Sequence, residues 1–427
     1  MLTLLICLFV VAYAAIALEH PLKVNKTATA LLAAGGLWTI YAVGANDPQT
    51  ISHELGESLM STAQIVFFLM GAMAIVEVID AHNGFDVLTS RVKTSSLSRL
   101  MWLVGFVTFF LSSVLDNLTT AIVMVSLMKK LLDQREDRLF FAGAIVIAAN
   151  AGGAWSPIGD VTTTMLWIGG QITALEIMKG VFLPALVSFL IPTFVMSCLL
   201  KGRAVTPPTH NVDAQEANTS PFEKNLMFFL GLGVLMAVPV FKGITSLPPF
   251  MGILLGLGFI WLIGDLVHKD KPDEDKSHLT LVSALTRIDM SAVLFFAGIL
   301  LAVATLEHTH ILASLAQWLD QQVGQLDIIV IIIGLVSAVV DNVPLVAAAM
   351  GMYSLEQHPT DSFLWEFLAY CAGTGGSILI IGSAAGVAAM GIEKIDFVWY
   401  LKKISLWALL GYLAGALVYI VQFQFMH

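Results

Sequence analysis

Apolar stretches of about 20 residues, almost free of charged side chains, recur from one end of this sequence to the other. That is the length of helix that crosses the hydrocarbon core of a bilayer. Only 12% of the residues are charged while 57% are hydrophobic, and no polar stretch is long enough to fold as a soluble domain. The sequence therefore predicts an all-α polytopic membrane protein.

The apolar stretches divide into roughly ten full spans and two segments of a different kind. The predicted spans are residues 2–18, 27–44, 58–79, 139–168, 174–200, 225–241, 248–267, 288–306, 362–392 and 398–424. The first of them has an alternative, because Ala12-Tyr13-Ala14 resembles a signal-peptidase site. No Lys or Arg precedes that apolar run, so we interpret it as a retained span.

Residues 100–132 and 326–355 form the two other segments, each about 30 residues long with an aspartate near the middle. A straight helix of that length would measure ~45 Å, whereas the hydrocarbon core is only ~30 Å thick. We therefore predict two re-entrant hairpins, each of which enters and leaves the membrane on one side. A single tilted helix is the alternative for each segment.

The positions of the basic residues favour the hairpins. With both hairpins in place, 19 of the 21 Lys and Arg residues lie on one side of the membrane, and only Lys179 and Lys242 lie on the other. This positive-inside distribution places the larger set in the cytoplasm and both termini in the periplasm of a bacterial inner membrane. A single crossing at either segment would move every later loop to the opposite side and remove the bias.

Three landmarks recur in the same order and indicate an internal repeat. The matched pairs are Phe67 with Phe295, Asp116 with Asp341, and Gly152 with Gly375, at offsets of 228, 225 and 223 residues. Because the predicted topology starts the two copies on opposite sides of the membrane, the repeats are predicted to be inverted. Many secondary transporters share that arrangement, with the substrate site at the repeat interface.

The repeat gives a predicted domain organisation. It comprises N-terminal scaffold spans (1–57), inverted repeat 1 (58–200), a cytoplasmic linker (201–224), scaffold spans with a cytoplasmic loop (225–287) and inverted repeat 2 (288–427). Each repeat is expected to contain one re-entrant hairpin and one broken transmembrane helix. The broken helices are residues 139–168 and 362–392.

Three aspartates, Asp116, Asp160 and Asp341, lie inside apolar segments. A carboxylate at the bilayer centre costs about 2.5–3.5 kcal/mol, so each needs a compensating partner or a function. The alternative is that each aspartate only caps a helix, because Asp116-Asn117 precedes a good helix start. An uncharged Asn or Ser would cap as well, so we predict a functional site.

The glycine-rich runs predict breaks in two spans. Gly152-Gly153, Pro157 and Gly159 fall in the middle of 139–168, where they should open the helical ladder. Opened backbone presents carbonyl oxygens, which together with carboxylate, amide and hydroxyl oxygens suit a small hard cation. Residues 373–377 should break 362–392 in the same way. Close helix packing by small residues is the alternative there.

Three ionisable residues near the ends of spans are candidates for a proton relay or a pH sensor: Glu77, His82 and His310. The two histidines occupy matching positions at opposite ends of the repeated spans. The alternative for them is a solvated position at the membrane interface, and Glu77 could equally reach out to that interface.

The stretches 115–120, 153–167 and 340–346 resemble the NhaD-type sodium/proton antiporters of the ion-transporter superfamily. The resemblance covers nearly the whole chain, and Trp-Ser-Pro-Ile-Gly-Asp-Val-Thr-Thr-Thr at 155–164 is quite specific to that family. It implies exchange of Na⁺ or Li⁺ for H⁺, favoured at alkaline pH. It also implies a homodimer in which scaffold spans hold a mobile transport domain made of the two hairpins and the two broken helices.

The resemblance further implies the residues of a cation site. These are Asp116, Asn117, Asn150, Asp160, Thr162 and Thr163 in the first copy, and Ser337, Asp341, Asn342, Ser377 and Ser383 in the second. The second copy departs from the first, because Ser383 stands where Asp160 is expected and Ala385-Gly386 replace the two threonines. Whether the second copy binds a cation is therefore open.

The alternative function is an anion carrier for dicarboxylates or oxyanions, since the same superfamily includes such proteins. An anion site favours Ser, Asn and Thr at helix N-termini without buried carboxylates. Here both hairpin tips carry Asp, and no Lys or Arg is predicted deep in a span. We find no Gly-x-Ser-x-Gly, His-Glu-x-x-His or phosphate loop, so no enzyme is predicted. We expect no cofactor and no nucleic-acid partner; the surroundings are membrane lipid.

Overall fold

The computed structural model describes residues 1–45, 48–89, 94–205, 219–269, 271–272 and 276–426. Within these residues the secondary structure is helical, apart from one isolated bridge between Ser96 and Ala204. The helices are α1 (Leu2–Ala17), α2 (Glu19–Leu22), α3 (Lys26–Gly44), α4 (Pro48–Ala81), α5 (Asp86–Thr89), α6 (Leu97–Ser112), α7 (Asn117–Leu131), α8 (Arg135–Ala154), α9 (Val161–Ile168), α10 (Ala174–Leu199), α11 (Pro221–Thr245), α12 (Pro249–Val267), α14 (Leu281–Leu285), α15 (Met290–His308), α16 (Ile311–Val323), α17 (Leu326–Val336), α18 (Asn342–Met352), α19 (Phe363–Gly375), α20 (Ala384–Glu393), α21 (Phe397–Lys403) and α22 (Ser405–Met426).

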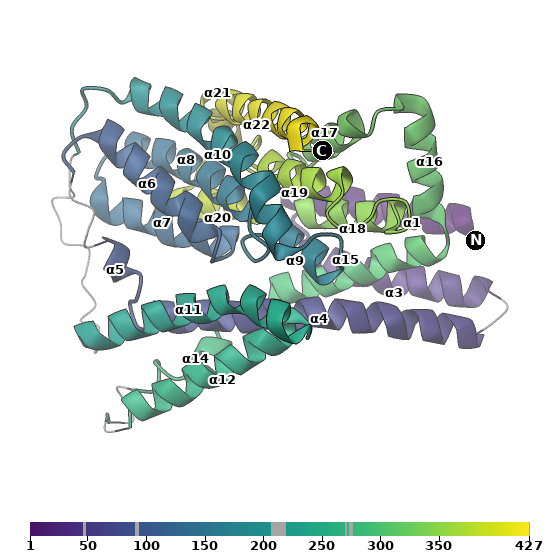
Figure 1. The fold of residues 1–427 in the computed structure, drawn as a ribbon, viewed down its shortest axis with the longest axis horizontal. Coiled ribbons are helices and arrows are strands. Elements are labelled where there is room, and N and C mark those ends of the chain that lie inside the picture. Colours follow the sequence, from purple (N-terminus) through teal and green to yellow (C-terminus); the bar gives the residue numbers. More distant parts are fainter. Residues whose placement is uncertain (46–47, 90–93, 206–218, 270, 273–275, 427) are drawn as a thin grey trace.

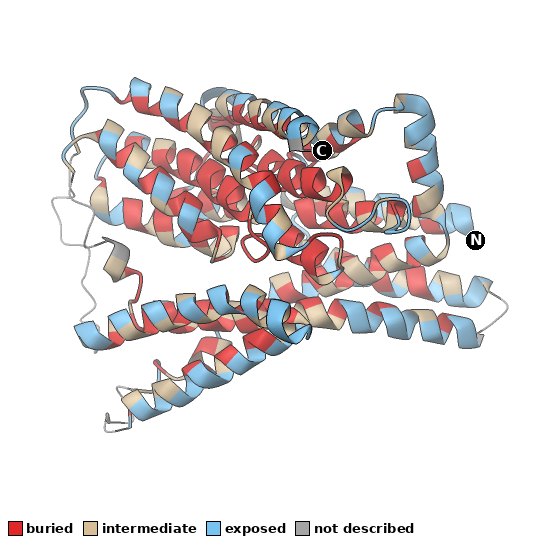
Figure 2. Ribbon diagram, in the orientation of Figure 1, coloured by how far each residue is buried: buried red, intermediate tan, exposed pale blue. Residues whose placement is uncertain are grey.

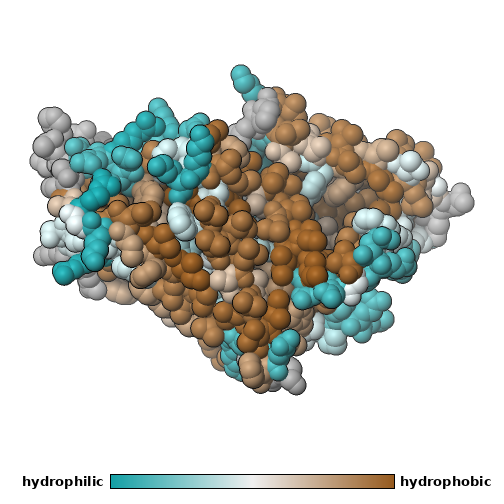
Figure 3. Space-filling model, turned by 90° about the horizontal axis from the view of Figure 1, so that it is seen from above, coloured by the Kyte–Doolittle hydropathy of each residue, from teal (hydrophilic) through white to brown (hydrophobic). Residues whose placement is uncertain are grey.

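The surface has the polarity of a membrane protein. Figure 3 shows hydrophobic residues over most of the middle of one face, with hydrophilic residues gathered toward the two ends of the long axis. Within the described residues, seven helices are long and apolar enough to cross a membrane, or eight if the bent pair α16–α17 counts as one span. The chain is therefore a polytopic, all-helical membrane protein.

Our prediction of roughly ten full spans was too high, for a reason visible in three segments. Residues 2–18 form only the 16-residue helix α1. Residues 139–168 and 362–392 are each divided into two shorter helices, so neither counts as one long span. The amphipathic helix α16 was not predicted; it meets α17 at 115°.

The predicted helix breaks are confirmed in both glycine-rich runs. Helix α8 ends at Ala154 and α9 begins at Val161, while α19 ends at Gly375 and α20 begins at Ala384. Asp160 caps α9 and Ser383 caps α20, each through its side chain. The two breaks therefore occupy equivalent sequence positions and are followed by equivalent caps.

Both predicted hairpin segments also consist of two helices with a break at the aspartate, α6–α7 and α17–α18. The backbone N–H of Leu97, which starts α6, donates to the carbonyl of Arg203 at 3.1 Å. Arg203 in turn lies 2.7 Å from Asp137, in the first turn of α8. The chain therefore enters α6 and leaves α7 at the same end of the molecule, as Figure 1 shows.

The helix pair α17–α18 also begins and ends at one end of the molecule. Tyr353, directly after α18, donates its hydroxyl to Asp320 at 3.4 Å. Asp320 belongs to α16, the helix that directly precedes α17. The start of α17 and the end of α18 are thus held at one end of the molecule.

The centre of the molecule is formed by α8 and α19. Nearly every residue of both helices is buried, whereas α11 and α12 expose apolar side chains along their outer faces (Figure 2). Glycines allow this close packing at two equivalent points. A Cβ at Gly152 would clash with the carbonyl of Phe109 in α6, and a Cβ at Gly375 would clash with the carbonyl of Gly334 in α17. The glycines therefore serve close packing as well as the helix breaks.

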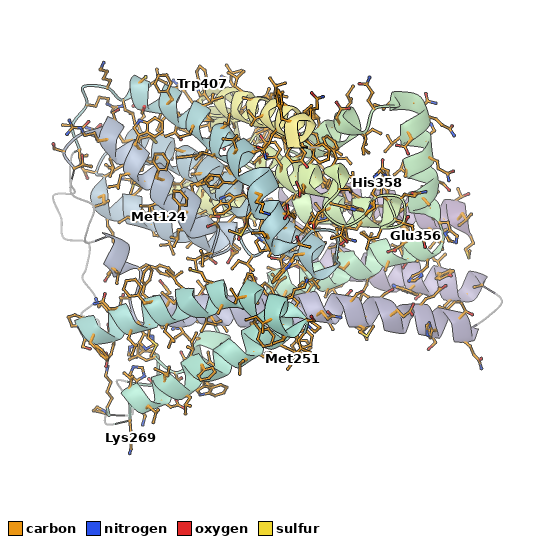
Figure 4. All side chains as sticks on the ribbon, in the orientation of Figure 1. Met124, Met251, Lys269, Glu356, His358 and Trp407 are labelled. Atoms are coloured by element: carbon orange, nitrogen blue, oxygen red, sulfur yellow. The ribbon has the colours of Figure 1, made fainter. Side chains whose placement is uncertain are left out.

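Loops that the predicted topology puts on opposite sides of the membrane lie toward opposite ends of the molecule. In Figure 4, Lys269 lies at one end of the long axis and Glu356 and His358 lie toward the other. The predicted topology, which puts Lys269 in the cytoplasm and the loop after α18 outside, requires such a separation. The basic residues Arg91 and Lys93, and residues 206–218 of the predicted linker, lie outside the described residues.

Candidate functional site

A cavity of about 520 Å³ lies at the helix breaks. Its polar lining includes both aspartate-asparagine pairs and the break between α8 and α9, namely Asp116, Asn117, Asp160, Asp341 and Asn342. It continues past Glu77, Arg287 and Asp289, which lie at the ends of α4 and α15 that the predicted topology places in the cytoplasm. The structure thus brings three carboxylates from distant parts of the sequence to one cavity.

Asp160 accepts hydrogen bonds from both aspartate-asparagine tips, which are the breaks between α6 and α7 and between α17 and α18. Its side chain accepts a bond from the backbone N–H of Thr162 at 3.1 Å, because Asp160 is the N-cap of α9. Its other oxygen accepts the side-chain amides of Asn117 at 2.9 Å and Asn342 at 3.3 Å. Asp160 is only 2% exposed, so this carboxylate is stabilised by neutral donors instead of water.

Asn150 of α8 links the start of α7 to the break after α19. Its amide oxygen accepts a bond from Asn117 at 3.0 Å, and its amide nitrogen donates to the hydroxyls of Ser377 and Ser383, both at 2.9 Å. These bonds fix which atom of each amide faces which neighbour. The side-chain oxygens of Asn117 and Asn342 then accept no bond from the described residues, so they are free to bind a ligand.

Both tip aspartates cap helices, as the structural alternative predicts. Asp116 accepts the backbone N–H of Thr119 at 2.8 Å and its hydroxyl at 2.6 Å, at the start of α7. Asp341 accepts the N–H of Val343 at 3.3 Å, at the start of α18. Capping does not require a charge, however, and both carboxylates also line the cavity. The capping role and a ligand role are therefore compatible.

Lys26 changes the charge of this cavity in a way that the sequence did not indicate. It is the first residue of α3, and its ammonium lies 2.7 Å from a carboxylate oxygen of Asp341. No Lys or Arg was predicted deep in a span, and Lys26 lies at the start of one, yet its side chain reaches the buried polar site. We had counted Lys26 only as a cytoplasmic loop charge, because nothing nearby in sequence shows that it faces a residue 315 positions away.

The predicted serines and threonines lie outside the cavity lining. Thr163 donates to the carbonyl of Asp160 at 2.9 Å, and Ser337 donates to the carbonyl of Ala372, also at 2.9 Å. The hydroxyls of Thr162 and of Thr120, which was not among the predicted residues, are buried without a partner in the described residues. Buried hydroxyls of this kind are costly unless something binds them, which marks both as candidate ligands.

The three candidate proton-handling residues occupy different environments. Glu77 lines the cavity and pairs with Arg287 at 3.2 Å. His310 is exposed at the start of α16 and is not part of the cavity lining. The structure therefore brings only Glu77 to the cavity.

His82 lies just past the end of α4 and stacks on His268, a residue that the sequence did not single out. The ring centroids are 5.0 Å apart and the two Nε2 atoms 3.3 Å apart, while Nδ1 of His82 donates to the carbonyl of Val78 at 2.7 Å. Glu223 and Lys271 are the charged neighbours. Burial of the ring lowers the pKa of His82 to about 4, which keeps it neutral at physiological pH.

This shift predicts a pH-dependent stability. Because the folded-state pKa is below the unfolded value of about 6.5, the contribution of His82 is complete above about pH 6.5 and is lost as the pH falls toward 4. His82→Gln should therefore flatten the decrease in melting temperature between about pH 7.5 and 5, measured in detergent. Equal slopes in the wild type and the variant would contradict this.

Carboxylate and amide oxygens gather at the helix breaks, while much of the remaining lining is apolar, including Phe68, Ile122 and Phe296. Such oxygens are the ligands of small hard cations, and carboxylates also bind protons. The buried position favours dehydrated ions, since the protein oxygens replace water. The arrangement can therefore bind a monovalent cation or protons at the same atoms.

Comparisons with known proteins place this geometry in context. A family model described as a citrate transporter matches residues 13–373. The chain is 51% identical to sodium/proton antiporter 1 of Arabidopsis thaliana, with 97% of this chain and 71% of that protein covered. It is 46% identical to sodium/proton antiporter 2 of the same plant, with 98% and 99% covered. It is 32% identical to the Na(+)/H(+) antiporter NhaD of Alkalimonas amylolytica, with 97% and 89% covered.

A solved structure supports the fold independently. The YdaH transporter of Alcanivorax borkumensis, whose crystal structure has been described as showing an unusual topology, aligns with a TM-score of 0.57. The alignment covers 94% of this chain and 98% of that one, at 13% identity. At that identity the likeness concerns the fold alone.

Proposed function

Because the chain belongs to the family of NhaD-type sodium/proton antiporters, we propose that it exchanges Na⁺, or Li⁺, for H⁺ at the cavity lined by Asp116, Asp160 and Asp341. The observation that carries this proposal is the convergence of Asn117 and Asn342 on Asp160. Both tips thereby point one carboxylate and one free amide oxygen toward a single buried site. The other predicted cation-site residues are proposed to hold these ligands in position; they are Asn150, Thr162, Thr163, Ser337, Ser377 and Ser383.

The mechanism follows from the chemistry of the ligands. A carboxylate binds Na⁺ only while it is ionised, and neighbouring carboxylates make full ionisation of the group harder. Protons and Na⁺ then compete for the same oxygens, and no separate proton pathway is required. Glu77 would pass protons between the cavity and the cytoplasm, and His310 would act as a pH sensor. His82 would respond only to acid, because its pKa of about 4 keeps it neutral at physiological pH.

The fold that we propose for this exchange consists of two inverted repeats within a scaffold, with the domain boundaries expected from the sequence. Equivalent hydrogen bonds support the repeat. Ser112 donates to the carbonyl of Ala149 at 2.6 Å, and Ser337 donates to the carbonyl of Ala372 at 2.9 Å. Donor and acceptor shift by 225 and 223 residues, the offsets found in the sequence. Two re-entrant hairpins would then meet at the midplane, where inverted-repeat transporters bind their substrates.

The cavity favours a conformation open to the cytoplasm. Its lining runs from Asp160 to Glu77 and Arg287, at the predicted cytoplasmic ends of their helices. At the other end, Lys242 of α11 donates to the carbonyl of Trp167 at 2.7 Å and lies 4.6 Å from the centre of its indole. This contact covers the end of α9. Alternating access would require it to open when the site faces outward.

Transport of an anion is the competing function, and the family model is described as a citrate transporter. Everted membrane vesicles that hold a pH gradient distinguish the two. Addition of NaCl or LiCl should dissipate the gradient, whereas KCl and sodium-free succinate should not. Dissipation by succinate without a response to NaCl would overturn the proposal.

We further propose a bacterial inner membrane as the location, both termini in the periplasm, and a homodimer formed through the scaffold spans. After removal of the native cysteines, cysteines placed at Ser98 and Lys129 should react with an impermeant reagent from the cytoplasmic side. A cysteine at Gln357 should react from outside. Labelling of positions 98 and 129 from opposite sides would contradict the re-entrant hairpin and the inverted repeat with it.

A further inference from the structure

The ion pair between Lys26 and Asp341 has no counterpart in the first copy of the repeat. Lys26 belongs to α3, whereas Asp341 lies at the tip between α17 and α18. The two side chains are 26% and 12% exposed, so the pair is mostly shielded from water. The ring of Phe295 lies 4.5 Å from the ammonium and helps to hold it in place. Among the described residues, Asp116 has no basic partner within salt-bridge distance.

The sequence explains why the two tips need different partners. Asp116 is satisfied by the backbone N–H and the hydroxyl of Thr119. At an offset of 225 residues, the equivalent position is Pro344, which has neither of those donors. One oxygen of Asp341 therefore lacks a partner from its own helix, and Lys26 supplies one from another part of the molecule.

The rest of the second copy offers fewer oxygen ligands for a cation than the first copy does. Ser383 stands in place of Asp160, and Ala385-Gly386 stand in place of Thr162-Thr163. Besides Asp341, the second copy contributes only Asp289 to the carboxylates of the cavity lining, and Asp289 caps the start of α15, not a hairpin tip. The ammonium lies where a cation bound to Asp341 would lie.

We propose that Lys26 is a tethered cation that occupies Asp341, the carboxylate at the second tip, so that the cavity binds its transported Na⁺ through first-copy residues and Asn342. This inference rests on the proposed Na⁺/H⁺ exchange and specifies how many ions the site takes. Because Lys26 is covalently part of α3, its charge is never transported. Its role is to position and neutralise Asp341, and thereby to set the number of ions bound.

Removing the ammonium should convert the second tip into a cation site. A shielded carboxylate that loses its partner attracts another cation. Binding of radioactive Na⁺ to the purified protein at about pH 9, where protons compete least, measures the number of ions. The wild type should bind about one Na⁺ per chain and Lys26→Gln about two, whereas Lys26→Arg should bind about one because it keeps the charge.

The double variant Lys26→Gln/Asp341→Asn removes both charges together and should again bind about one Na⁺. It provides the test if the single variant does not fold. The inference is overturned if Lys26→Gln binds one ion like the wild type, if it binds none, or if the double variant loses the remaining ion. A wild type that binds no Na⁺ at all would overturn the proposed function together with the inference, so the two failures are distinguishable.

Discussion

Replacement of Asp160 by Asn should lower the rate of Na⁺/H⁺ exchange by more than about 100-fold while the protein remains in the membrane. The amide oxygen of the new side chain can still accept the N–H of Thr162, so the cap of α9 is kept. Its NH₂ group, however, would face the two amide donors of Asn117 and Asn342. The variant therefore loses both the charge that binds Na⁺ and the acceptor that holds the two tips together.

The measurement is the dissipation of a pH gradient by NaCl in everted vesicles, normalised to the amount of inserted protein. Asp116→Asn should show a similar loss of exchange, because it removes a carboxylate from the cavity lining. The protein should stay folded, since the amide oxygen of Asn can still cap α7. Asp396→Asn is the matched control, since Asp396 caps the exposed start of α21 by accepting the N–H of Trp399 at 2.9 Å. Near-normal exchange by Asp160→Asn would show that its charge is not used in transport.

The second large effect is expected at Gly152 and Gly375, where the broken helices α8 and α19 pack against α6 and α17. Gly152→Ala would place a methyl group against the carbonyl of Phe109, and Gly375→Ala would place one against the carbonyl of Gly334. Backbone atoms cannot rotate away as a side chain can. Each change should therefore destabilise the protein by ~1–3 kcal/mol or more and separate a tip from its partner helix.

The matched controls are Gly56→Ala in α4 and Gly233→Ala in α11, because a Cβ at either position meets nothing within 4 Å. Alanine favours a helix over glycine, so these changes should leave the melting temperature unchanged or raise it slightly. Melting temperature in detergent and exchange in vesicles are the readouts. Normal values for both Gly152→Ala and Gly375→Ala would show that the helices do not pack as closely as described.

Much of the site could be predicted because charges in apolar surroundings are conspicuous. Asp116, Asp160 and Asp341 each interrupt an apolar run, and the structure brings all three to one cavity. The helix breaks were equally predictable, because Gly and Pro act on the backbone at their own positions. The family resemblance implied that Asn150, Ser377 and Ser383 are site residues, but their hydrogen bonds to one another could not be derived from local pattern.

The features that were missed depend on contacts between distant segments. Lys26 lies at the end of a span, where a basic residue is already explained by topology. Its reach to Asp341 depends on how α3 packs beside α15 and the second tip. His268 was missed for the same reason, since only the stacking with His82 makes it notable. The count of full spans was too high because it included the two segments predicted to be broken and because residues 2–18 form only a 16-residue helix.

The most direct test of the whole account is the pH dependence of Na⁺ binding during exchange. Sodium titrations between about pH 6.5 and 9.5 bracket the range in which a buried carboxylate with a raised pKa would titrate. If protons and Na⁺ compete for the same oxygens, the apparent affinity for Na⁺ should fall as the pH falls, and the maximal rate should change much less. An apparent affinity that does not vary with pH, with all the pH dependence in the maximal rate, would contradict direct competition.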